Sequence, residues 1–390
     1  MRTTLLSLVY LLSGAIAAQW ASVVSGTITQ LEAVHIIDAQ NILACGKDGE
    51  LVHSVNGGAS WAPLVSGYGD DLNEIMQLDA STILIIADGG VVLRSANGGA
   101  AWNMSATGTG SELVSAARYG TVIVAVGEEG AILRSTDLGN AWSLVASGSL
   151  QDLQAVAALD ADTWIAVGKS GTVLRSMDGG MAWSPAASGT TADLNDVALP
   201  SAATGLICGD EGVMLRSTDG GQNWLPIASG TGNDLKALWS TSSTSVFTCG
   251  VGGTVRTSAD AGLTWTAMTT PVLTELTDLM LAGSTGFAVG AAGTILRLGA
   301  TTTGLGDLVG EEAIRFGPMP CDGEFVLTLS DVALAGLLTA DLLDAQGRLV
   351  RRTGLILDSA RFTDLAPGRY VCSVHREGVP VLVRPVMVVR

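Results

Sequence analysis

The sequence predicts an all-β protein dominated by a seven-bladed β-propeller, and the main observation is a repeat with a near-constant period. An eight-residue pattern, Ser-x-Asp-x-Gly-x-x-Trp, recurs at segments 54–61, 95–102, 135–142, 176–183, 217–224 and 258–265, with Asn replacing Asp in the first two. Counting Trp20, the repeat tryptophans are separated by 41, 41, 40, 41, 41 and 41 residues. Short apolar runs between glycine turns indicate four strands per repeat, which is typical of a propeller blade.

Each copy of this pattern, called an octet below, is expected to form a tight turn. Its hydroxyl and carboxylate or amide oxygens can accept hydrogen bonds from backbone N–H groups, and its glycine supplies the positive φ that the turn needs. The tryptophan is expected to pack beneath the turn. The predicted structural residues are Asn56, Asn97, Asp137, Asp178, Asp219 and Asp260, together with Trp61, Trp102, Trp142, Trp183, Trp224 and Trp265.

The number of blades follows from counting the strands between octets. Seven sets of three strands lie at 31–54, 72–95, 113–135, 153–176, 194–217, 235–258 and 276–297. The tryptophan segment that follows each set can supply the outer strand of that blade. The seventh set has no such segment after residue 298, and the segment that begins at Trp20 has no set before it. We therefore expect the strand at 20–24 to pair with residues 294–297 and to close the ring without an open edge.

The chain is expected to comprise four parts. Residues 1–18 carry Arg2, an apolar run at 5–12 and small residues at 15–17, which predicts a signal peptide, and no later stretch reaches the length of a membrane span. The propeller is expected over 19–299 and a flexible linker over 300–311. Residues 312–390 predict a small antiparallel β-sandwich, with strands at 325–329, 337–343, 349–352, 370–374 and 381–389.

The acidity of the chain belongs to its repeats. The net charge is −17, and residues 312–390 hold nine acidic residues and nine arginines, so the excess of acid lies in the propeller. The negative electrostatic potential of these residues opposes binding to a phosphate backbone, so no nucleic-acid partner is expected. His and Cys are nowhere clustered at ligand spacing, so neither a metal site nor a cofactor is predicted.

The cysteines predict core packing. Cys45, Cys208 and Cys249 occupy one equivalent position, directly before a repeat glycine, where other repeats have valine. They are expected to be small buried side chains too far apart for disulfides. Whether Cys321 and Cys372 are bridged is left open by the sequence.

A column of acidic residues begins the innermost strands. The residue ten places after each repeat tryptophan is acidic in six of seven repeats, and in a propeller the start of this strand lies at the channel mouth. These side chains are candidates for a carboxylate ring that binds a cation or a basic segment. The alternative is that they cap loop N–H groups or are simply solvated. The column, called the mouth column below, is Gln30, Asp71, Glu112, Asp152, Asp193, Asp234 and Glu275.

A second column precedes the octets. It consists of His53, Arg94, Arg134, Arg175, Arg216, Thr257 and Arg297, with Arg256 one place out of register. The expected role of these arginines is hydrogen bonding between blades and to turn carbonyls, and the alternative is a patch that captures acidic groups of a partner. We call this the arginine column.

At a third repeat position, which we call the third column, the side chains differ in size from blade to blade. Four places after the first leucine of each inner strand stand His35, Met76, Ala117, Ala157, Ala198, Trp239 and Met280. The large members of this column form either an apolar recess, in which Trp239 would be a candidate binding residue, or the packing of an imperfectly symmetric channel. The pair Arg118 and Tyr119 falls outside the repeat pattern and is a further candidate.

The octets match the Asp-box, or bacterial neuraminidase repeat. The full repeat, with Gly-x-Val-Leu-Arg-Ser before the octet, resembles the photosystem II stability and assembly factor family of seven-bladed propellers over residues 20–298. The resemblance implies the fold, and it indicates function only weakly because sialidases, sorting receptors and many other exported proteins share this repeat.

Residues 315–390 resemble the C-terminal sorting domain of type IX secretion. The similarity rests on Gly-Pro-Met-Pro at 317–320, Leu-Leu-Asp-Ala-Gln-Gly-Arg at 342–348, Leu-Ala-Pro-Gly-Arg-Tyr at 365–370 and a basic, apolar end at 384–390. Met319 departs from the family, which usually has Asn there. The resemblance implies the type IX secretion machinery as a partner and release or attachment at the cell surface.

Two classes of function remain. The first is a non-enzymatic propeller that acts as a protein- or glycan-binding platform at the cell surface or outside the cell. The alternative is a secreted glycoside hydrolase. Sialidases with this repeat need an arginine trio and a tyrosine nucleophile, and the repeat region offers only Tyr68 and Tyr119. Other glycosidases need just two carboxylates at a suitable separation, so an acidic mouth leaves that alternative open.

Overall fold

The computed structural model describes residues 20–299, 314–317, 325–329, 338–344, 349–354, 359–363, 365–376 and 379–388. The chain divides into two compact units, of which the first ends at Gly299. The predicted signal peptide at 1–18 and linker at 300–311 lie outside the described residues, as does Cys321. None of the described helices has the length and apolar character needed to cross a membrane.

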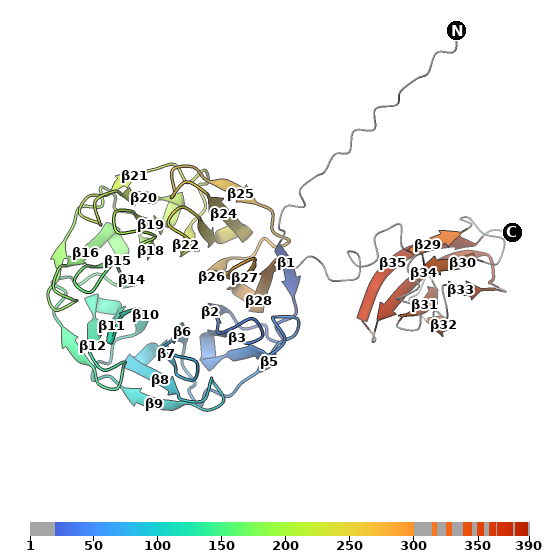
Figure 1. Ribbon diagram of the computed structural model, residues 1–390, viewed down its shortest axis with the longest axis horizontal. Coiled ribbons are helices and arrows are strands. Elements are labelled where there is room, and N and C mark those ends of the chain that lie inside the picture. Colours follow the sequence, from blue (N-terminus) through green and yellow to red (C-terminus); the bar gives the residue numbers. More distant parts are fainter. Residues whose placement is uncertain are drawn as a thin grey trace, which may run out of the picture. The chain divides into compact units, whose positions relative to one another are not determined.

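The first unit is a ring of seven antiparallel four-stranded sheets, which confirms the predicted propeller (Figure 1). Blade 1 is β2 to β5, blade 2 is β6 to β9, and each following group of four strands makes the next blade up to β25. The innermost strands are β2 (Leu31–Ile36), β6 (Leu72–Gln77), β10 (Leu113–Tyr119), β14 (Leu153–Ala158), β18 (Leu194–Ala198), β22 (Leu235–Ser240) and β26 (Leu276–Ala282).

The second strands are the apolar centre of each blade, because neighbouring blades cover both of their faces. They are β3 (Ile42–Gly46), β7 (Ile83–Ala87), β11 (Val122–Gly127), β15 (Trp164–Gly168), β19 (Gly205–Gly209), β23 (Val246–Gly250) and β27 (Thr285–Gly290). Each leads into a short 3₁₀ turn: η1 (Lys47–Gly49), η2 (Asp88–Gly90), η3 (Glu128–Gly130), η4 (Lys169–Gly171), η5 (Asp210–Gly212), η6 (Val251–Gly253) and η7 (Ala291–Gly293).

The third strands run from these turns to the octets, and the outer strands follow the octets. The third strands are β4 (Leu51–Ser54), β8 (Val91–Ser95), β12 (Ile132–Ser135), β16 (Thr172–Ser176), β20 (Met214–Ser217), β24 (Thr254–Ser258) and β28 (Thr294–Leu298). The outer strands are β5 (Ala62–Pro63), β9 (Asn103–Ala106), β13 (Ser143–Val145), β17 (Ser184–Pro185), β21 (Leu225–Pro226), β25 (Thr266–Met268) and, for blade 7, β1 (Trp20–Val23).

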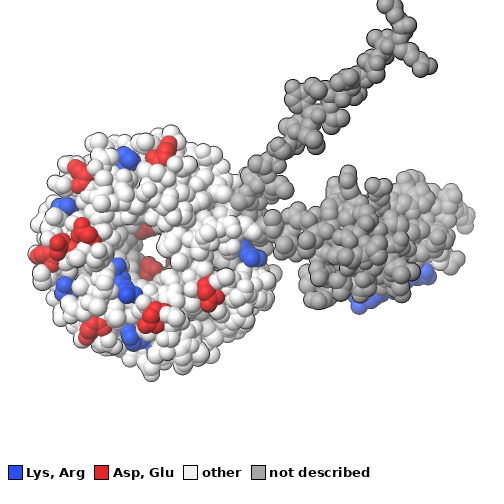
Figure 2. All heavy atoms as spheres, viewed as in Figure 1, with Lys and Arg blue, Asp and Glu red and all other residues white. Residues whose placement is uncertain are grey.

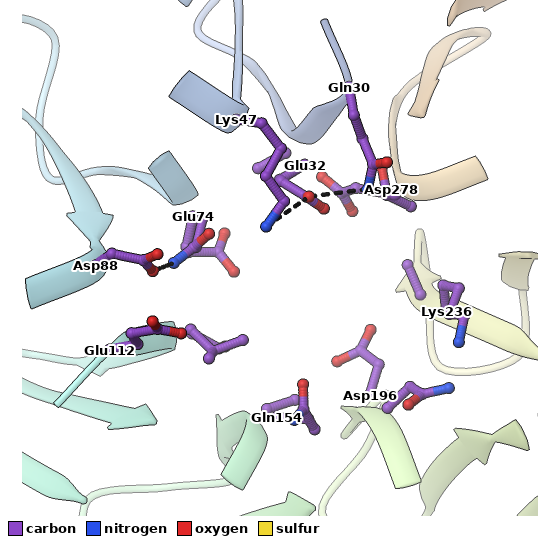
Figure 3. Close-up of a pocket in the computed structure, with 18 of the residues that line it drawn as sticks. Gln30, Glu32, Lys47, Glu74, Asp88, Glu112, Gln154, Asp196, Lys236 and Asp278 are labelled. Atoms are coloured by element: carbon purple, nitrogen blue, oxygen red, sulfur yellow. Dashed lines mark hydrogen bonds and ion pairs between the residues drawn. The ribbon is translucent and has the colours of Figure 1, made fainter. Parts of the chain in front are cut away.

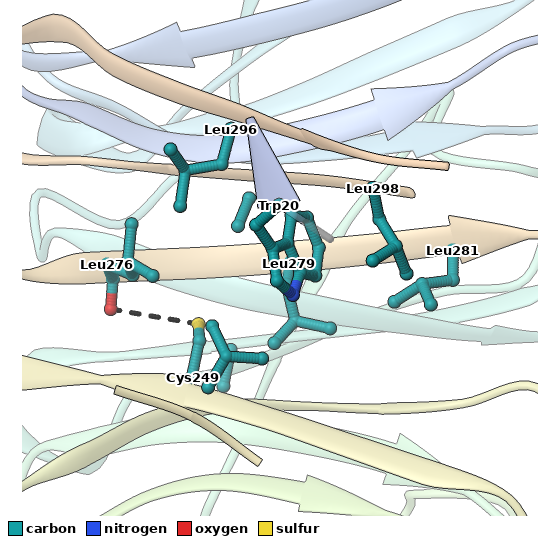
Figure 4. Close-up of a cluster of buried hydrophobic side chains, with 10 residues drawn as sticks. Trp20, Cys249, Leu276, Leu279, Leu281, Leu296 and Leu298 are labelled. Carbon is teal, nitrogen blue, oxygen red and sulfur yellow. Dashed lines mark hydrogen bonds between the residues drawn. The ribbon is translucent and has the colours of Figure 1, made fainter. Parts of the chain in front are cut away.

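Ring closure occurs as the sequence predicts. Blade 7 has the strand order β1-β28-β27-β26, so its outer strand comes from the start of the propeller sequence. Trp20 pairs with Leu298 and Val23 with Ile295. The Trp20 side chain is only 4% exposed and packs in a cluster with Leu276, Leu296 and Leu298 (Figure 4).

The octets form the hydrogen-bonded turns that their residue types predict. In the octet of blade 5, the Ser217 hydroxyl donates to Asp219 Oδ1 at 2.8 Å and accepts from Gly221 N–H at 2.9 Å, while Asp219 Oδ1 accepts from Asn223 N–H at 3.0 Å. Gly221 has φ of +79°. Hydrogen bonds from the side chain and the N–H of Asn223, and from the Ser217 hydroxyl, hold the pKa of the Asp219 carboxyl at about 2. An octet aspartate is therefore a structural anion at the end of its blade.

The repeat cysteines are core residues, as predicted. Cys45, Cys208 and Cys249 are free and fully buried. Each thiol donates to the first leucine carbonyl of the next blade, at 3.4 to 3.7 Å. These cysteines therefore help to join neighbouring blades.

The described strands of the second unit form two antiparallel sheets. One has the order β29-β30-β33 and the other β32-β31-β34-β35. The strands are β29 (Ile314–Gly317), β30 (Phe325–Leu329), β31 (Leu338–Asp344), β32 (Leu349–Gly354), β33 (Ser359–Phe362), β34 (Gly368–Arg376) and β35 (Val379–Val388). Five lie at the predicted positions, and β29 and β33 were not predicted. Cys372 is a buried free thiol. The packing of the two sheets as a sandwich stays a prediction.

Candidate ligand site at the channel mouth

A pocket of about 430 Å³ lies at the end of the channel where the inner strands begin. Figure 2 shows the opening at the centre of the ring, with acidic side chains inside it. Two lysines and eight carboxylate residues line the pocket, the latter being Glu32, Glu74, Asp88, Glu112, Glu128, Asp196, Glu275 and Asp278. The pocket is therefore strongly anionic.

A β-bulge in every inner strand builds this lining. In blade 1 the pairing of β2 with β3 passes from Leu31 directly to Ala33, so Glu32 is the unpaired extra residue. The same register shift follows the first leucine of the inner strand in all seven blades. A bulge lets two consecutive residues face the same side, where a regular strand would alternate them. Both residues after each leucine can therefore reach the channel.

Three carboxylates from separate blades occupy the deeper level of the pocket. Glu74, Asp196 and Asp278 come from blades 2, 5 and 7 and point into the opening (Figure 3). Asp196 Oδ2 accepts from Leu238 N–H of the next blade at 2.6 Å, and Asp278 Oδ2 accepts from Val34 N–H of blade 1 at 2.8 Å. These two aspartates therefore join blades as well as lining the pocket.

Burial raises the pKa of all three deeper carboxyl groups. Desolvation raises the pKa of Asp196 to about 7 and that of Asp278 to about 6, although their backbone donors partly offset the effect. Desolvation also raises the pKa of Glu74 well above its usual value, with a smaller contribution from the two aspartates. All three residues line the pocket and are partly buried. The negative charge of Asp196 and Asp278 therefore grows as the pH rises through this range.

Four members of the mouth column act as caps. Asp71, Asp152, Asp193 and Asp234 each accept through Oδ1 from the backbone N–H of the residue 23 positions earlier, in the preceding blade, at 2.8 to 3.0 Å. Those donors, Asp48, Glu129, Ser170 and Glu211, have φ of 54° to 56° inside the 3₁₀ turns. The capping interpretation thus holds for the aspartates, which fix a left-handed backbone that non-glycine residues rarely adopt.

The other members of the mouth column reach the pocket. Gln30, Glu112 and Glu275 all line it, whereas none of the four capping aspartates does. The turns facing Glu112 and Glu275 carry Gly89 and Gly252 at the left-handed position, and glycine adopts this conformation without a cap. Asp and Glu in one sequence column therefore have different roles.

Both lysines of the pocket are already held by carboxylates. Lys47 Nζ lies 2.7 Å from Asp71 Oδ2 and 3.3 Å from Glu32 Oε1. Lys236 Nζ lies 3.1 Å from Asp210 Oδ1 and 4.0 Å from Glu275 Oε1. In both cases the ammonium group lies between carboxylates that come from two different blades.

One side of the pocket has carboxylates without such a lysine. We call Glu74, Asp88, Glu112 and Glu128 the acidic sector. In the described part of the chain, none of them has a Lys or Arg nitrogen within the 4.0 Å of an ion pair. The charge of Asp88, followed by burial and the charge of Glu128, raises the pKa of Glu112. Like charges thus remain close together, and a cation placed there would relieve their repulsion.

The remaining candidate residues lie away from the mouth or are engaged. Arg118 donates to the Leu78 carbonyl at 2.6 Å and to the Gly120 carbonyl at 2.8 Å. Tyr119 is the last residue of β10, at the end of the strand opposite the mouth, and is 46% exposed. Trp239 donates through Nε1 to the Leu281 carbonyl at 2.9 Å and packs against the blade 7 core. These contacts give Arg118 and Trp239 structural roles.

The third column mainly packs the channel. Met76 and Met280 lie against hydrophobic clusters between blades. Burial lowers the pKa of His35, which is hydrogen-bonded to Gln77 and to Ile75. No group of three or more His, Cys, Asp or Glu among the described residues is arranged to hold a metal ion.

Sequence reasoning missed the deeper carboxylates and both lysines. Reading the second residue after each inner-strand leucine gives Ala33, Glu74, Ser115, Ala155, Asp196, Ala237 and Asp278, a column with three acids in an otherwise small-residue position. In a regular strand, side chains alternate between the two faces, so only one of the two residues after each leucine would be expected to face the channel. The bulge was the missing information.

No protein-family model matches the chain, and no curated protein matches it in sequence. Solved structures do resemble it. The structure of YCF48 bound to a D1 peptide matches with a TM-score of 0.61 and 19% identity, covering 72% of this chain and 94% of that one. YCF48 from Cyanidioschyzon merolae matches at 0.60 and 18%, covering 72% and 98%. The WD40 propeller domain of Doa1 matches at 0.62 and 11%, covering 74% and 99%. At these identities the likeness establishes the propeller fold.

Proposed function

We propose that the propeller is a non-enzymatic binding platform whose channel mouth holds an extended basic segment of a partner protein. The observation that carries this proposal is the anionic pocket, in which two lysines of the chain already sit between carboxylates while the acidic sector has no such partner. A lysine or arginine of a partner would complete that sector in the same way.

The shape of the site also favours a peptide. The pocket lies within the usual size range of ligand sites, and it opens at the end of the ring, where a chain can enter. A propeller of similar fold, YCF48, has been solved with a peptide bound, which supports a protein partner. The carboxylate-rich lining favours a basic peptide over an uncharged glycan. No contact of Arg118 or Tyr119 favours the sialidase-like alternative.

A peptide-binding measurement tests this function. A labelled octapeptide of alternating Arg and Ser should bind in a fluorescence anisotropy titration, and the same peptide with Glu for Arg should not. Glu112→Gln should weaken binding by about tenfold, because it removes a charge-assisted contact. Asp162→Asn is the matched control: it also removes one charge, but at an exposed turn near the octets, and should leave the affinity nearly unchanged.

Salt and pH give a second signature of the same site. Affinity should fall as salt rises, because the contact is electrostatic. Affinity should increase from pH 5.5 to pH 8, because Asp278 and Asp196, with pKa values of about 6 and 7, become anionic over this interval. Equal binding of the basic and acidic peptides, or equal losses in Glu112→Gln and Asp162→Asn, would reject the channel mouth as the site.

We also propose that the protein acts outside the cytoplasm and is delivered by its C-terminal unit. The support is the secretory pattern at 1–18 and the similarity of residues 315–390 to type IX sorting domains. A chain ending at Gly299 should then accumulate in the periplasm, whereas the full chain should reach the surface or the medium. Cell fractionation distinguishes these outcomes, and surface delivery of the shortened chain would refute the sorting role.

A further inference from the structure

Hydrogen bonds from four members of the arginine column join successive blades, whereas blade 1 has no arginine in this column. In four blades the arginine donates to the carbonyl of the third residue after the octet serine of the next blade. The bonds are Arg94 Nη1 to Leu138 at 2.8 Å, Arg134 Nε to Gly179 at 2.7 Å, Arg175 Nε to Gly220 at 3.3 Å and Arg216 Nε to Ala261 at 2.9 Å. Thr257 replaces arginine where blade 7 has no octet to reach. Blade 1 is followed by a complete octet yet carries His53.

His53 does not make the missing contact. Its Nδ1 lies 3.2 Å from the Ala62 carbonyl of its own blade, so the ring is held within blade 1. The equivalent acceptor in blade 2 is Gly98, and no arginine of the described propeller donates to it. Gly98 is exposed, whereas its counterparts Gly179 and Gly220 are buried.

The space beside Gly98 is open as well. A Cβ added to Gly98 would have no atom within 4 Å, whereas a Cβ on Gly179 would lie 3.6 Å from Arg134 Nη2. Gly98 is thus open on the side where Gly179 meets the guanidinium group of Arg134.

An apolar cavity of about 230 Å³ occupies this position between blades 1 and 2. Its lining includes Ile37, Leu43, His53 and Leu64 of blade 1 and Gly98 to Ala100 of the blade 2 octet. The volume is below that of a usual drug-sized pocket and suits a single side chain. The cavity lies at the octet end of the sheets, opposite the channel mouth, because Ser54 pairs with Ile42 while Leu51 pairs with Cys45 near the turn η1.

The chemistry of the cavity fits one class of side chain. Apolar walls suit the methylene stem of a long side chain, and the carbonyl oxygen of the exposed residue Gly98 suits a cationic N–H donor. No Lys or Arg lines the cavity, and the net charge of −17 favours the approach of a cation. A guanidinium N–H is also the donor that bonds to the equivalent carbonyl in the four other interfaces.

We propose that the cavity between blades 1 and 2 is a binding site for an arginine side chain of a partner protein, whose guanidinium group donates to the Gly98 carbonyl. The partner arginine thereby takes the place of the arginine that blade 1 lacks. This site is separate from the channel mouth and does not depend on the function proposed there.

The test uses n-propylguanidinium, which reproduces an arginine side chain from Cβ outward, and the full-length protein. Adding it should shift the NMR signals of the His53 imidazole and raise the Tm through preferential binding to the folded state. n-Propylurea has nearly the same shape without the charge and should bind at least about tenfold more weakly. His53→Arg should abolish the response, because the new side chain fills the cavity.

The reverse substitution supplies a second, independent readout. Arg134→His should open an equivalent cavity beside Gly179, lower the Tm and regain part of the loss when n-propylguanidinium is added. Absence of any His53 shift in the wild-type protein would overturn the proposal. So would equal binding by the His53→Arg variant, or equal binding of the urea, which would indicate an apolar cavity without specificity for a cation.

The source of the arginine is tested by sedimentation velocity. Six of the seven propeller arginines, at positions 94, 118, 134, 175, 216 and 256, already donate to backbone carbonyls, and two acidic propellers repel one another, so we do not expect one propeller to bind another through this face. Self-association that disappears in His53→Arg would assign the arginine to a second copy of this chain and would overturn the partner assignment.

Discussion

Trp20→Ala should lower the free energy of unfolding by about 3–5 kcal/mol, which is the usual cost of removing a large buried aromatic side chain. The reason is the position of Trp20 at the closure of the ring. Its indole fills a cluster built from blades 6 and 7, including Cys249, Leu279 and Leu298, and its strand β1 covers the edge of β28 (Figure 4). Loss of this packing loosens the strand that hides an unpaired edge, so aggregation should accompany the loss of stability.

Urea denaturation checks this result, with Val24→Ala as the control. Val24 directly follows β1 but is 84% exposed, so its truncation should change stability by less than about 0.5 kcal/mol. If Trp20→Ala unfolded at the wild-type urea concentration, the N-terminal strand would contribute nothing to ring closure.

Gly168→Ala should be the second most disruptive substitution, with an expected loss of about 3 kcal/mol or more from steric overlap. A Cβ at Gly168 would lie 2.0 Å from the backbone carbonyl oxygen of Asp152, closer than any real contact allows. Gly168 is extended, with φ of −173° and ψ of −162°, so the obstacle is this contact rather than an unfavourable φ. The overlap also pushes on the residue that caps the turn of the preceding blade.

Blade 2 shows how the chain accommodates a side chain at this position. Ala87 is the equivalent residue, and its φ of −140° and ψ of 165° differ from those of Gly168. Gly110→Ala is the control, because a Cβ there would meet no atom within 4 Å. Thermal unfolding should show a large decrease of Tm for Gly168→Ala and almost none for Gly110→Ala. Equal Tm values for the two variants would show that the inner strands shift freely, contrary to a rigid bulge.

The fold was predictable because its determinants are local and repeated. The octets place a turn every 41 or 40 residues. The first tryptophan segment has no blade of its own and the seventh set of strands has no outer strand, so pairing the two avoids an exposed edge. The role of the arginine column was predictable for a similar reason, since a long cationic side chain before a turn can reach turn carbonyls.

The site was less predictable because it depends on backbone details. Asp152 and Glu112 occupy the same sequence column, yet one caps a left-handed Glu129 and the other lines the pocket. The residue opposite differs as well: Glu112 faces Gly89, and glycine adopts a left-handed backbone at little cost, whereas Asp152 caps the left-handed Glu129. Asp196 and Asp278 stand two places after the first leucine of their inner strands. They can be recognised as pocket residues only once it is known that a bulge places two consecutive residues in the channel.

A crystal structure of the protein with the Arg-Ser octapeptide tests the central claim most directly. The account predicts peptide density in the channel mouth, with at least one guanidinium group within ion-pair distance of Glu112 or Glu128 and no displacement of Lys47 from Asp71. Peptide bound along an outer strand or at the octet face, with the mouth unchanged, would contradict it.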